Sequence, residues 1–437
     1  MKNSTIGILD SALIMGTFTG GGGVNAQEII PRLAEKFDLI YFPRTDVAHR
    51  LNEDKKNKII SNIEILEKLN IRVSESFKKL FKDFNDFSNE SFRKFREELL
   101  DRYSKELEET SLLYENDFYV PLFPDLNFEG DIYRLLKIKK DTKFGITLRG
   151  FGDINSSNHW RILVNILRNE KLNFNSQLRG KYISMIVGPY KNRKLMTKII
   201  KSGKLDFVGY VNSYLVGLFS LSGNNVRLFD LFPADASRFM ANSNTKEKID
   251  NQIVFFARLV PEKGIFEIPK IAKYLNDLGK NFMIKVVGKF AFESDRDIFF
   301  QLIRKLHVDD TVEYLGFLPE KELMSVVSSS KVYVYPTHSD AYAISILESL
   351  QLRVPVVTYG IPPLRNLYKN VCAVRFVEEY DYFGMAVAVS ELLSADDDYI
   401  NHLFDDRTTE FLKQHSSYDR VAEKIISMLE AELNSKT

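Results

Sequence analysis

The sequence predicts an α/β protein with two doubly wound domains of similar size. Short apolar runs alternate with longer amphipathic stretches along the chain, a pattern typical of βαβ units and mainly parallel sheets. A chain of 437 residues also exceeds one ordinary hydrophobic core, which favours more than one domain. Each domain is therefore expected to have a Rossmann-like sheet covered by helices.

The first domain is predicted at residues 1–240. Its first apolar run is followed by an expected glycine-rich loop at residues 20–23 and a helical pattern from Ala26. The glycine stretch lacks the Lys-Ser/Thr ending of a P-loop and the spacing of a dinucleotide fingerprint, so alone it is a weak signal. Strands are expected at residues 6–9, 39–42, 144–148, 183–187 and 207–211.

A segment at about residues 52–115 has an almost continuous helical pattern, and we interpret it as a helical insertion in the first domain. Phe77, Phe81, Phe92 and Phe95 recur at helical spacing with Lys and Arg between them. A basic aromatic helix could lie on an anionic membrane surface; alternatively, the Phe stripes form the seam of a helical hairpin. Acidic residues in the same segment dilute its basic character and favour the hairpin.

The second domain, predicted at residues 241–415, shows the strand–helix alternation best. The join is placed in the polar stretch 241–251, which has no apolar period. Within the C-terminal segment 416–437, a last helix at residues 418–433 is expected to pack back across the join. Strands are expected at residues 253–257, 283–287, 312–315, 331–335, 354–358 and 373–376.

Composition argues against several classes of protein. A net charge of +1 gives no whole-chain field that would indicate nucleic acid as a partner. No secretory signal is recognised, and no run reaches the roughly 18 apolar residues of a membrane span. The single cysteine, Cys372, lies in an apolar run and is expected as a buried thiol. We expect a cytoplasmic protein, free or peripheral on a membrane.

One strand–loop–helix junction carries two carboxylates. An apolar run ends at Pro336, and Asp340 and Glu348 follow on the loop and the opening turns of a helix. In open α/β sheets, ligands bind outside the carboxyl ends of the strands. The first amides of this helix, at Ala343 and Ile344, could receive an anion, and a carboxylate further along suits paired hydroxyls. The junction therefore predicts a nucleotide or sugar site.

Two cations follow an earlier strand of the same domain. Arg258 offers a forked donor for phosphate oxygens, Lys263 a movable point charge, and Gly264 permits close backbone approach. This set suits a diphosphate, although both cations could equally be solvated charges beside a loop.

These motifs, in this order, resemble those of the family 4 (GT4-type) retaining glycosyltransferases, which have the GT-B fold. The resemblance is strongest at residues 226–359, and the order of the motifs is more specific than any one of them. The family's Arg-Leu and Lys-Gly pairs appear as Arg258-Leu259 and Lys263-Gly264, its strand-end glycine as Gly288, its apolar-glycine turn as Gly316-Phe317, and its paired acids as Asp340 and Glu348.

The resemblance implies two Rossmann-like domains facing a cleft, with the donor held by the second. It implies that Arg258 and Lys263 hold the donor diphosphate, that Glu348 holds the nucleotide ribose, and that Asp340 faces the donor sugar. We take Asp340, Arg258 and Lys263 as the catalytic candidates. The remaining donor-binding candidates implied by the family are Gly22, Gly23, Gly288, Gly316, Phe317, Ala343 and Ile344.

The chain departs from the family pattern at several positions. Asp340 stands where the family usually has Glu, and Ala343 where it usually has Gly, which predicts an altered sugar pocket. Many members place a His after a strand of the first domain, where this chain offers Arg149. His159 and His338 are further candidates, although a lone His is more often a surface or packed residue.

No cofactor is expected, because the nucleotide sugar is a substrate. The resemblance also implies no metal, because GT-B enzymes use helix amides and cations, here Arg258 and Lys263, for the leaving diphosphate. Asp396-Asp-Asp398 resembles the metal-binding Asp-x-Asp of a different glycosyltransferase fold, but we interpret it as an exposed helix start.

The resemblance thus implies a retaining, hexosyltransferase-type enzyme of glycan or glycolipid synthesis. Its expected partners are a nucleotide-sugar donor and a glycan or lipid-linked acceptor, with no nucleic acid. Two alternatives stay open: another GT-B activity, such as an epimerase or phosphorylase, and a catalytically idle GT-B module that binds a nucleotide sugar or carbohydrate. Asp340, Ala343 and Arg149 keep the idle module open.

Overall fold

The structure is a computed structural model, and its described residues form two compact units. Unit 1 contains the described residues from 4 to 231 and from 418 to 435, and unit 2 contains those from 247 to 417. The described residues are 4–16, 21–49, 51–116, 118, 130–138, 141–149, 191, 193–222, 225–231, 247–415 and 417–435.

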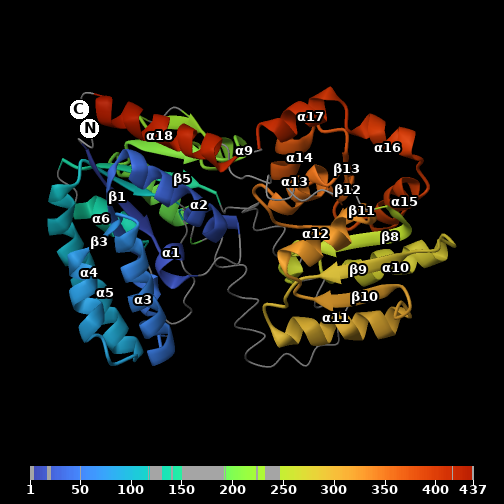
Figure 1. Ribbon diagram of the computed structural model, residues 1–437, viewed down its shortest axis with the longest axis horizontal. Helices are drawn as coiled ribbons and strands as arrows, with labels where there is room; N and C mark the ends of the chain where they lie inside the picture. The colour runs from blue at the N-terminus through green and yellow to red at the C-terminus, as the bar shows by residue number, and fades with distance from the viewer. Residues whose placement is uncertain are drawn as a thin grey trace. The chain divides into compact units, whose positions relative to one another are not determined.

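Unit 1 contains a parallel sheet with the strand order β3-β2-β1-β4-β5-β6-β7 (Figure 1). From β1 the order runs both ways, because Ile6 pairs with Leu39 of β2 on one side and Leu112 of β4 on the other. The strands are β1 Thr5–Asp10, β2 Asp38–Pro43, β3 Arg72–Val73, β4 Leu112–Glu115, β5 Lys143–Leu148, β6 Phe207–Tyr210 and β7 Arg227–Asp230.

The strands expected at 6–9, 39–42, 144–148 and 207–211 are confirmed as β1, β2, β5 and β6. The strand expected at 183–187 lies outside the described residues. The sequence does not predict β3, β4 and β7. β3 has 2 residues, and β7 has no fully buried residue, so neither gives an apolar run.

Helices connect and cover the strands of unit 1. Its helices include α1 Ala12–Met15, α2 Gly21–Lys36, η1 Thr45–Ala48, α3 Glu53–Lys68, α4 Glu75–Asp83, α5 Asn89–Glu106, η2 Leu107–Glu109, α6 Asp131–Ile138, α9 Tyr214–Leu218 and α18 Tyr418–Asn434, and residues 193–201 are helical as well. The loop expected at residues 20–23 is wrong for residues 21–23, because α2 already begins at Gly21 and includes Gly22 and Gly23 in its first turn; residue 20 lies outside the described residues. The first amides of a helix have no intrahelical acceptor, so this turn still presents backbone donors.

The segment at 52–115 is largely helical, as predicted, and it also contributes β3 and β4 to the sheet. Its helices begin at capping side chains: Asn52 accepts from the Lys55 amide, and Ser74 from the Phe77 amide. β4 escapes prediction because it has only 4 residues, three apolar and then Glu115, shortly after a helical stretch.

The helices α4 and α5 lie side by side (Figure 1), and the Phe stripes form the seam between them, as the hairpin interpretation predicts. Phe77, Phe81 and Phe95 are buried, and Phe84 lies 4.9 Å from Phe95 between ring centroids. Lys56 reaches in from α3 and its buried ammonium donates to the carbonyl oxygen of Phe84 at 2.9 Å. These aromatic rings therefore pack in the core of unit 1 and are not presented on its surface.

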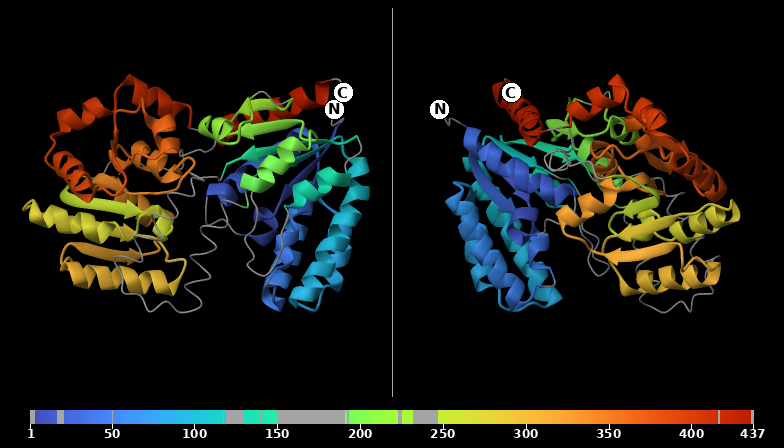
Figure 2. Two further views of the ribbon diagram at one scale, coloured as in Figure 1. Left: turned by 180° about the vertical axis from the view of Figure 1, so that it is seen from behind. Right: turned by 45° about the vertical axis from the view of Figure 1, so that its right-hand side comes forward.

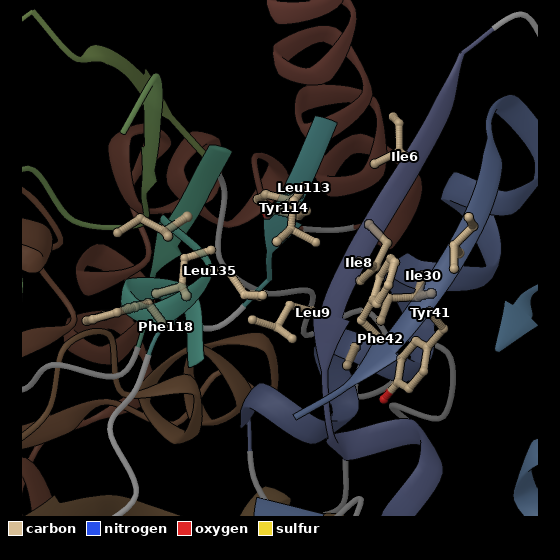
Figure 3. Close-up of a cluster of buried hydrophobic side chains, with 14 of the residues drawn as sticks. Ile6, Ile8, Leu9, Ile30, Tyr41, Phe42, Leu113, Tyr114, Phe118 and Leu135 are labelled. Atoms are coloured by element: carbon tan, nitrogen blue, oxygen red, sulfur yellow. The ribbon is translucent and has the colours of Figure 1, made fainter. Parts of the chain in front are cut away.

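The core of unit 1 lies between the sheet and its helices. In the close-up of Figure 3, Ile8 of β1, Phe42 of β2 and Ile30 of α2 lie together, and all three are fully buried. Burying a side chain of this size stabilises the fold by about 1.5–3 kcal/mol. Leu113 and Tyr114 continue the same core from β4.

The C-terminal helix α18 belongs to unit 1, and each view shows it beside the blue and green elements of that unit (Figure 2). It packs against α2, where Arg32 contacts Asp419 at 2.7 Å. Lys143 at the start of β5 donates to the carbonyl oxygen of Glu432 at 2.6 Å, and Arg227 pairs with the Glu432 side chain.

Unit 2 contains a parallel sheet with the strand order β10-β9-β8-β11-β12-β13. All six expected strands are confirmed. The strands are β8 Ile249–Phe256, β9 Met283–Val287, β10 Val312–Gly316, β11 Ser330–Tyr335, β12 Val356–Tyr359 and β13 Val374–Val377. The helices are η4 Pro261–Lys263, α10 Ile268–Asp277, α11 Glu293–Leu306, α12 Glu320–Ser328, α13 Ile344–Gln351, α14 Pro362–Tyr368, α15 Tyr382–Leu393, α16 Asp397–Leu403 and α17 Asp406–Lys413.

Over the described ranges, every helix is too short or too polar to cross a membrane.

Candidate functional site

The candidate site of unit 2 lies at the carboxyl ends of β8 and β11. From these two adjacent strands the strand order runs in opposite directions, to β9 and β10 on one side and to β12 and β13 on the other. Such a switch point is where open α/β sheets bind their ligands. The loop at residues 257–264 follows β8 and the loop at residues 336–343 follows β11, so the two predicted charged motifs meet at this point.

The loop after β8 presents two cations. Arg258 is exposed, and no hydrogen bond or ion pair ties it to any residue described in the structure. Lys263 ends the short helix η4, whose Pro261 fixes the first helical position. Gly264 has φ 82°, and an added Cβ would lie 2.0 Å from the carbonyl oxygen of Pro336. The predicted close approach at Gly264 is thus to the backbone of the β11 loop.

Lys263 and Asp340 form an ion pair at the centre of the site. The Lys263 ammonium lies 2.5 Å from Oδ2 of Asp340 and also donates to the carbonyl oxygen of Ser339 at 3.1 Å. Both side chains keep some exposure, 20% for Lys263 and 15% for Asp340. The pair is therefore accessible from outside.

The Asp340 carboxylate accepts from further donors besides Lys263. The hydroxyl of Tyr335 donates to Oδ2 at 2.7 Å, and the amides of Ala343 and Tyr342 donate to Oδ1 at 2.9 and 3.3 Å. Burial alone would raise the pKa of Asp340, but Lys263 and these hydrogen bonds outweigh it and hold the pKa below its usual value. Four donors match the lone-pair capacity of one carboxylate, so Asp340 accepts a new partner by releasing an old one.

The backbone at the start of α13 differs in part from the prediction. The Ala343 amide donates to Asp340 at 2.9 Å, so it would have to release this carboxylate to receive an anion, and its donor-binding role stays a prediction. Ile344 opens α13, where helix geometry provides no intrahelical acceptor for its amide. Ala343 itself has φ 56°, a left-handed conformation that suits Gly and is strained for Ala. Tyr368 fixes this turn by donating to the carbonyl oxygen of Tyr342 at 2.8 Å.

The second acid, Glu348, lies in α13 and is 6% exposed. Beside it, the hydroxyl of Tyr333 donates to Oγ of Ser345 at 2.9 Å. Asp340 and Glu348 therefore occupy the loop and the helix at one strand end, as predicted.

Two glycines shape the strand ends next to β8. Gly288 has φ 146°, and an added Cβ would lie 2.0 Å from the carbonyl oxygen of Ala257. Its amide donates to the carbonyl oxygen of Gly316 at 2.8 Å, which holds the ends of β9 and β10 together. Gly316 has φ 74° with open space beside it, and Phe317 is 70% exposed. An aromatic face is therefore available where the prediction places the base.

His338 is buried beside the site rather than exposed in it. Its Nδ1 lies 2.9 Å from Glu379 and its Nε2 3.3 Å from Glu267. Burial alone would lower the pKa of His338, but the two carboxylates outweigh it and raise the pKa above its usual value. Burial would raise the pKa of Glu267, but His338 and Lys270 lower it to about 2.

The unit 1 candidates lie at the carboxyl edge of its own sheet. Arg149 follows β5, and its Nε donates to the carbonyl oxygen of Asn116 at 3.0 Å. Nearby in the chain, Glu115 at the end of β4 pairs with Arg44 after β2 at 3.1 Å, with both side chains buried. His159 lies outside the described residues. These contacts describe unit 1 alone.

Motif reasoning missed the residues that hold the charged site together. Tyr335, Glu267 and Glu379 each contact a site residue, yet none lies in a motif of charged residues. Tyr335 had one usable signal: it sits two residues after Tyr333 on an apolar strand, so both hydroxyls on that strand face require partners.

Two other predicted features have ordinary roles. Asp396 caps α16 by accepting from the Tyr399 amide at 2.8 Å, as expected for a helix start. Within the described ranges, no cluster of three or more His, Cys, Asp or Glu side chains could hold a metal ion. Cys372 is half-buried and not fully buried as expected. Its thiol accepts from the guanidinium of the exposed Arg407 at 3.1 Å.

Known proteins resemble this chain at two levels. The family described as Glycosyl transferases group 1 matches residues 237–399. The capsular polysaccharide biosynthesis glycosyltransferase CapM of Staphylococcus aureus is 22% identical over 47% of this chain and 50% of its own length. The 2-deoxystreptamine glucosyltransferase of Streptomyces kanamyceticus is 25% identical over 30% of this chain and 33% of its own length. The chain thus spans half or less of these curated relatives.

Solved structures match over almost the whole chain. A glycosyltransferase from Rickettsia africae has a TM-score of 0.63 at 13% identity and covers 100% of both chains. HepE from Anabaena, solved with UDP and glucose, has a TM-score of 0.60 at 12% identity and covers 98% of this chain and 100% of its own. With its two parallel sheets, the chain has the GT-B fold, and its second unit matches the group 1 glycosyl transferases.

Proposed function

We propose that this protein is a glycosyltransferase that moves a sugar from a nucleotide-sugar donor to a hydroxyl of a glycan acceptor. One observation carries the proposal: Arg258, Lys263 and Asp340 converge at the switch point of a sheet whose domain matches the group 1 glycosyl transferases. Relatives named for capsule and O-antigen synthesis support a glycan acceptor.

Arg258 and Lys263 would hold the donor diphosphate, together with the amide of Ile344. Arg258 needs no rearrangement to do so, since it is exposed and unengaged among the described residues. Preorganised donors of this kind stabilise the negative charge that develops on a departing nucleoside diphosphate. Glu348 would receive the ribose hydroxyls, and Gly316 and Phe317 would border the base.

Asp340 would face the donor sugar after an exchange of partners. In the described structure, donors from the protein occupy the hydrogen-bonding positions of its carboxylate. Among these donors, Lys263 is the one that would also bind the diphosphate. When the Lys263 ammonium turns to the diphosphate, Oδ2 of Asp340 keeps the Tyr335 hydroxyl and can accept from a sugar hydroxyl in place of Lys263. Diphosphate binding and sugar recognition would thereby be coupled through one ion pair.

Calorimetry with a panel of nucleoside diphosphates and nucleotide sugars tests the donor site. Arg258→Ala should abolish or greatly weaken binding of the selected nucleotide, while Arg304→Ala, an exposed arginine on α11, should leave it unchanged. Equal affinity in wild type and Arg258→Ala would overturn the assignment of the diphosphate site.

The finer chemistry is part of the proposal. We propose retention at the anomeric carbon and a hexosyl donor, by the resemblance of the motifs to family 4. NMR of the first-formed product measures its anomeric configuration, and an inverted product would remove the retaining assignment.

We also propose a lipid-linked acceptor and peripheral membrane contact, based on the Lys and Arg residues of the helical segment at residues 52–115. Because the Phe rings at the seam of α4 and α5 are buried, we expect attachment through surface Lys and Arg, and it should weaken in high salt. Co-sedimentation with anionic vesicles at low salt measures this, and absence of co-sedimentation would exclude attachment by that surface.

A catalytically idle binding module is the second candidate, favoured by the filled carboxylate of Asp340 and the strained Ala343. This candidate predicts nucleotide-sugar binding without transfer to any acceptor and without donor hydrolysis. Detection of released nucleoside diphosphate that depends on Lys263 would exclude it.

A further inference from the structure

A buried charge cluster lies behind the candidate donor site. His338 is 1% exposed, and its ring stacks on Tyr380 at 4.6 Å between centroids. Its two nitrogens meet Glu267, which precedes α10, and Glu379, which follows β13. The cluster therefore joins three separate parts of unit 2 at one side chain.

The same residue is part of the loop that carries the site. The His338 amide donates to the carbonyl oxygen of Glu262 at 2.9 Å, and Oγ1 of Thr337 donates to the same oxygen at 3.1 Å. Glu262 precedes Lys263, and Ser339 supplies the carbonyl oxygen that accepts from the Lys263 ammonium. The position of His338 therefore fixes both loops from which Lys263 and Asp340 project.

The hydrogen bonds of His338 require its protonated form. A neutral imidazole has one N–H, whereas an imidazolium donates from both nitrogens. Both nitrogens face carboxylates, so a neutral ring would leave one nitrogen lone pair against a buried carboxylate.

The other groups that face the ring do not replace this charge. Lys270 of α10 contacts Glu267 at 3.0 Å, and the rings of Tyr359 and Tyr380 lie 5.2 and 4.6 Å from the imidazole. Tyr382 of α15 lies beyond Lys270, 3.3 Å from its ammonium. Among these contacts of the described residues, two carboxylates meet one lysine, and a charged His338 supplies the second positive charge that balances them.

We propose that His338 is a positioning residue for the donor site: as an imidazolium clamped between Glu267 and Glu379, it holds the loops of Lys263 and Asp340 in their binding geometry. The nucleotide part of this inference rests on the proposed function, while the positioning of the loops does not. Donor affinity then depends on a buried group that never touches the donor.

The sign of the pH dependence follows from the raised pKa of His338. Stabilisation from the clamp is complete below the ordinary His pKa and is lost as pH rises through the raised value. The loops should therefore loosen on the alkaline side, whereas a His that had to be neutral would loosen them on the acidic side.

Hydrogen exchange of the ligand-free protein tests the positioning by itself. The peptide covering residues 336–343 should exchange about tenfold faster in His338→Gln than in wild type at about pH 6.5, and the difference should shrink towards about pH 9. Intrinsic exchange rates cancel because both proteins are compared at each pH. His402→Gln, an exposed histidine of α16, is the matched control and should behave as wild type.

Affinity for UDP-glucose, used as the probe, tests the consequence for binding. Its diphosphate is esterified at both ends, so its charge stays constant over this pH range. We expect about tenfold weaker binding in His338→Gln at about pH 6.5, and in wild type a loss of affinity as pH rises. Glu379→Gln, which keeps the shape and removes one carboxylate, should move the midpoint of that loss to lower pH.

The outcomes separate the two levels of inference. Unchanged exchange at residues 336–343 in His338→Gln overturns the positioning role, even if the variant melts at a lower temperature. If exchange follows the expected pH pattern but UDP-glucose binds neither wild type nor variant, the clamp stands and the nucleotide assignment fails. An unshifted midpoint in Glu379→Gln would also overturn the clamp.

Discussion

The carboxyl edges of the two sheets carry similar residue types but use them differently. In unit 1, Arg44 and Glu115 form a buried pair, and Arg149 donates to the backbone of Asn116. In unit 2, Arg258 is exposed, and the Lys263–Asp340 pair keeps partial exposure. Charges at the first edge are neutralised by the fold itself, whereas the second edge offers cations to a ligand. The difference teaches that a charge marks a binding site by its exposure and by what it can exchange.

The largest effect is expected where the buried pair of unit 1 is broken. Glu115→Gln removes the carboxylate charge that lies 3.1 Å from the buried Arg44 guanidinium, which should cost about 3–5 kcal/mol of unfolding free energy. Urea unfolding measures the loss, with the exposed Glu109→Gln as control. A loss below about 1 kcal/mol would show that water reaches Arg44 and that the two edges are not so different.

The second effect is on turnover at the unit 2 edge. Lys263→Met keeps the stem and removes the charge, and sugar transfer should fall about 10²–10³-fold because one donor to the developing charge is lost. The matched control is Lys273→Met, which removes only a half-exposed surface pair on α10. Steady-state kinetics with the selected donor measures turnover of both variants. Equal turnover in Lys263→Met and Lys273→Met would contradict a special role of Lys263.

A third test concerns the packing that brings the two loops of unit 2 together. Gly264→Ala places a methyl against the Pro336 carbonyl at a left-handed φ, and should cost about 1–3 kcal/mol and weaken nucleotide binding. Gly279→Ala has a similar φ of 67° but open space, so it isolates the backbone strain. Thermal unfolding of the two variants should differ; equal losses would mean that the β11 loop yields to the methyl.

The smallest effect is expected at Ala343. Ala343→Gly relieves a left-handed φ of 56°, and after the entropy cost of Gly in the unfolded chain we expect a gain of up to about 1 kcal/mol. Removing the methyl also restores the residue usual in the resembling family. Chemical unfolding measures the gain, and a destabilised variant would show that the methyl packs favourably at this turn.

Sequence reasoning located the second unit well because its strands are apolar runs with clear loops between them. All six strands of that sheet are confirmed, and the charged motifs at residues 258–263 and 340–348 meet at one edge. β3 and β7 escaped because a 2-residue strand and a partly exposed edge strand leave no pattern to read.

The contacts within the site could not be predicted from the sequence, because they join residues that are far apart in the chain. His338 meets Glu267 and Glu379, residues 71 and 41 positions away, and only the strand order brings them together. Likewise, the partner of Gly264 is the backbone of Pro336, which no local motif can name. Periodicity predicts elements, whereas such pairings depend on topology.

The docking of α18 on unit 1 has a consequence for synthesis on the ribosome. Its residues Val421, Ile425 and Met428 are buried against a unit whose first strand is made some four hundred residues earlier. Because α18 follows unit 2 in the chain, the ribosome makes all of unit 2 before the helix that completes the core of unit 1. A nascent chain that stalls before residue 418 would leave the face of α2 that packs against α18 uncovered, so unit 1 completes its core only once α18 has been made.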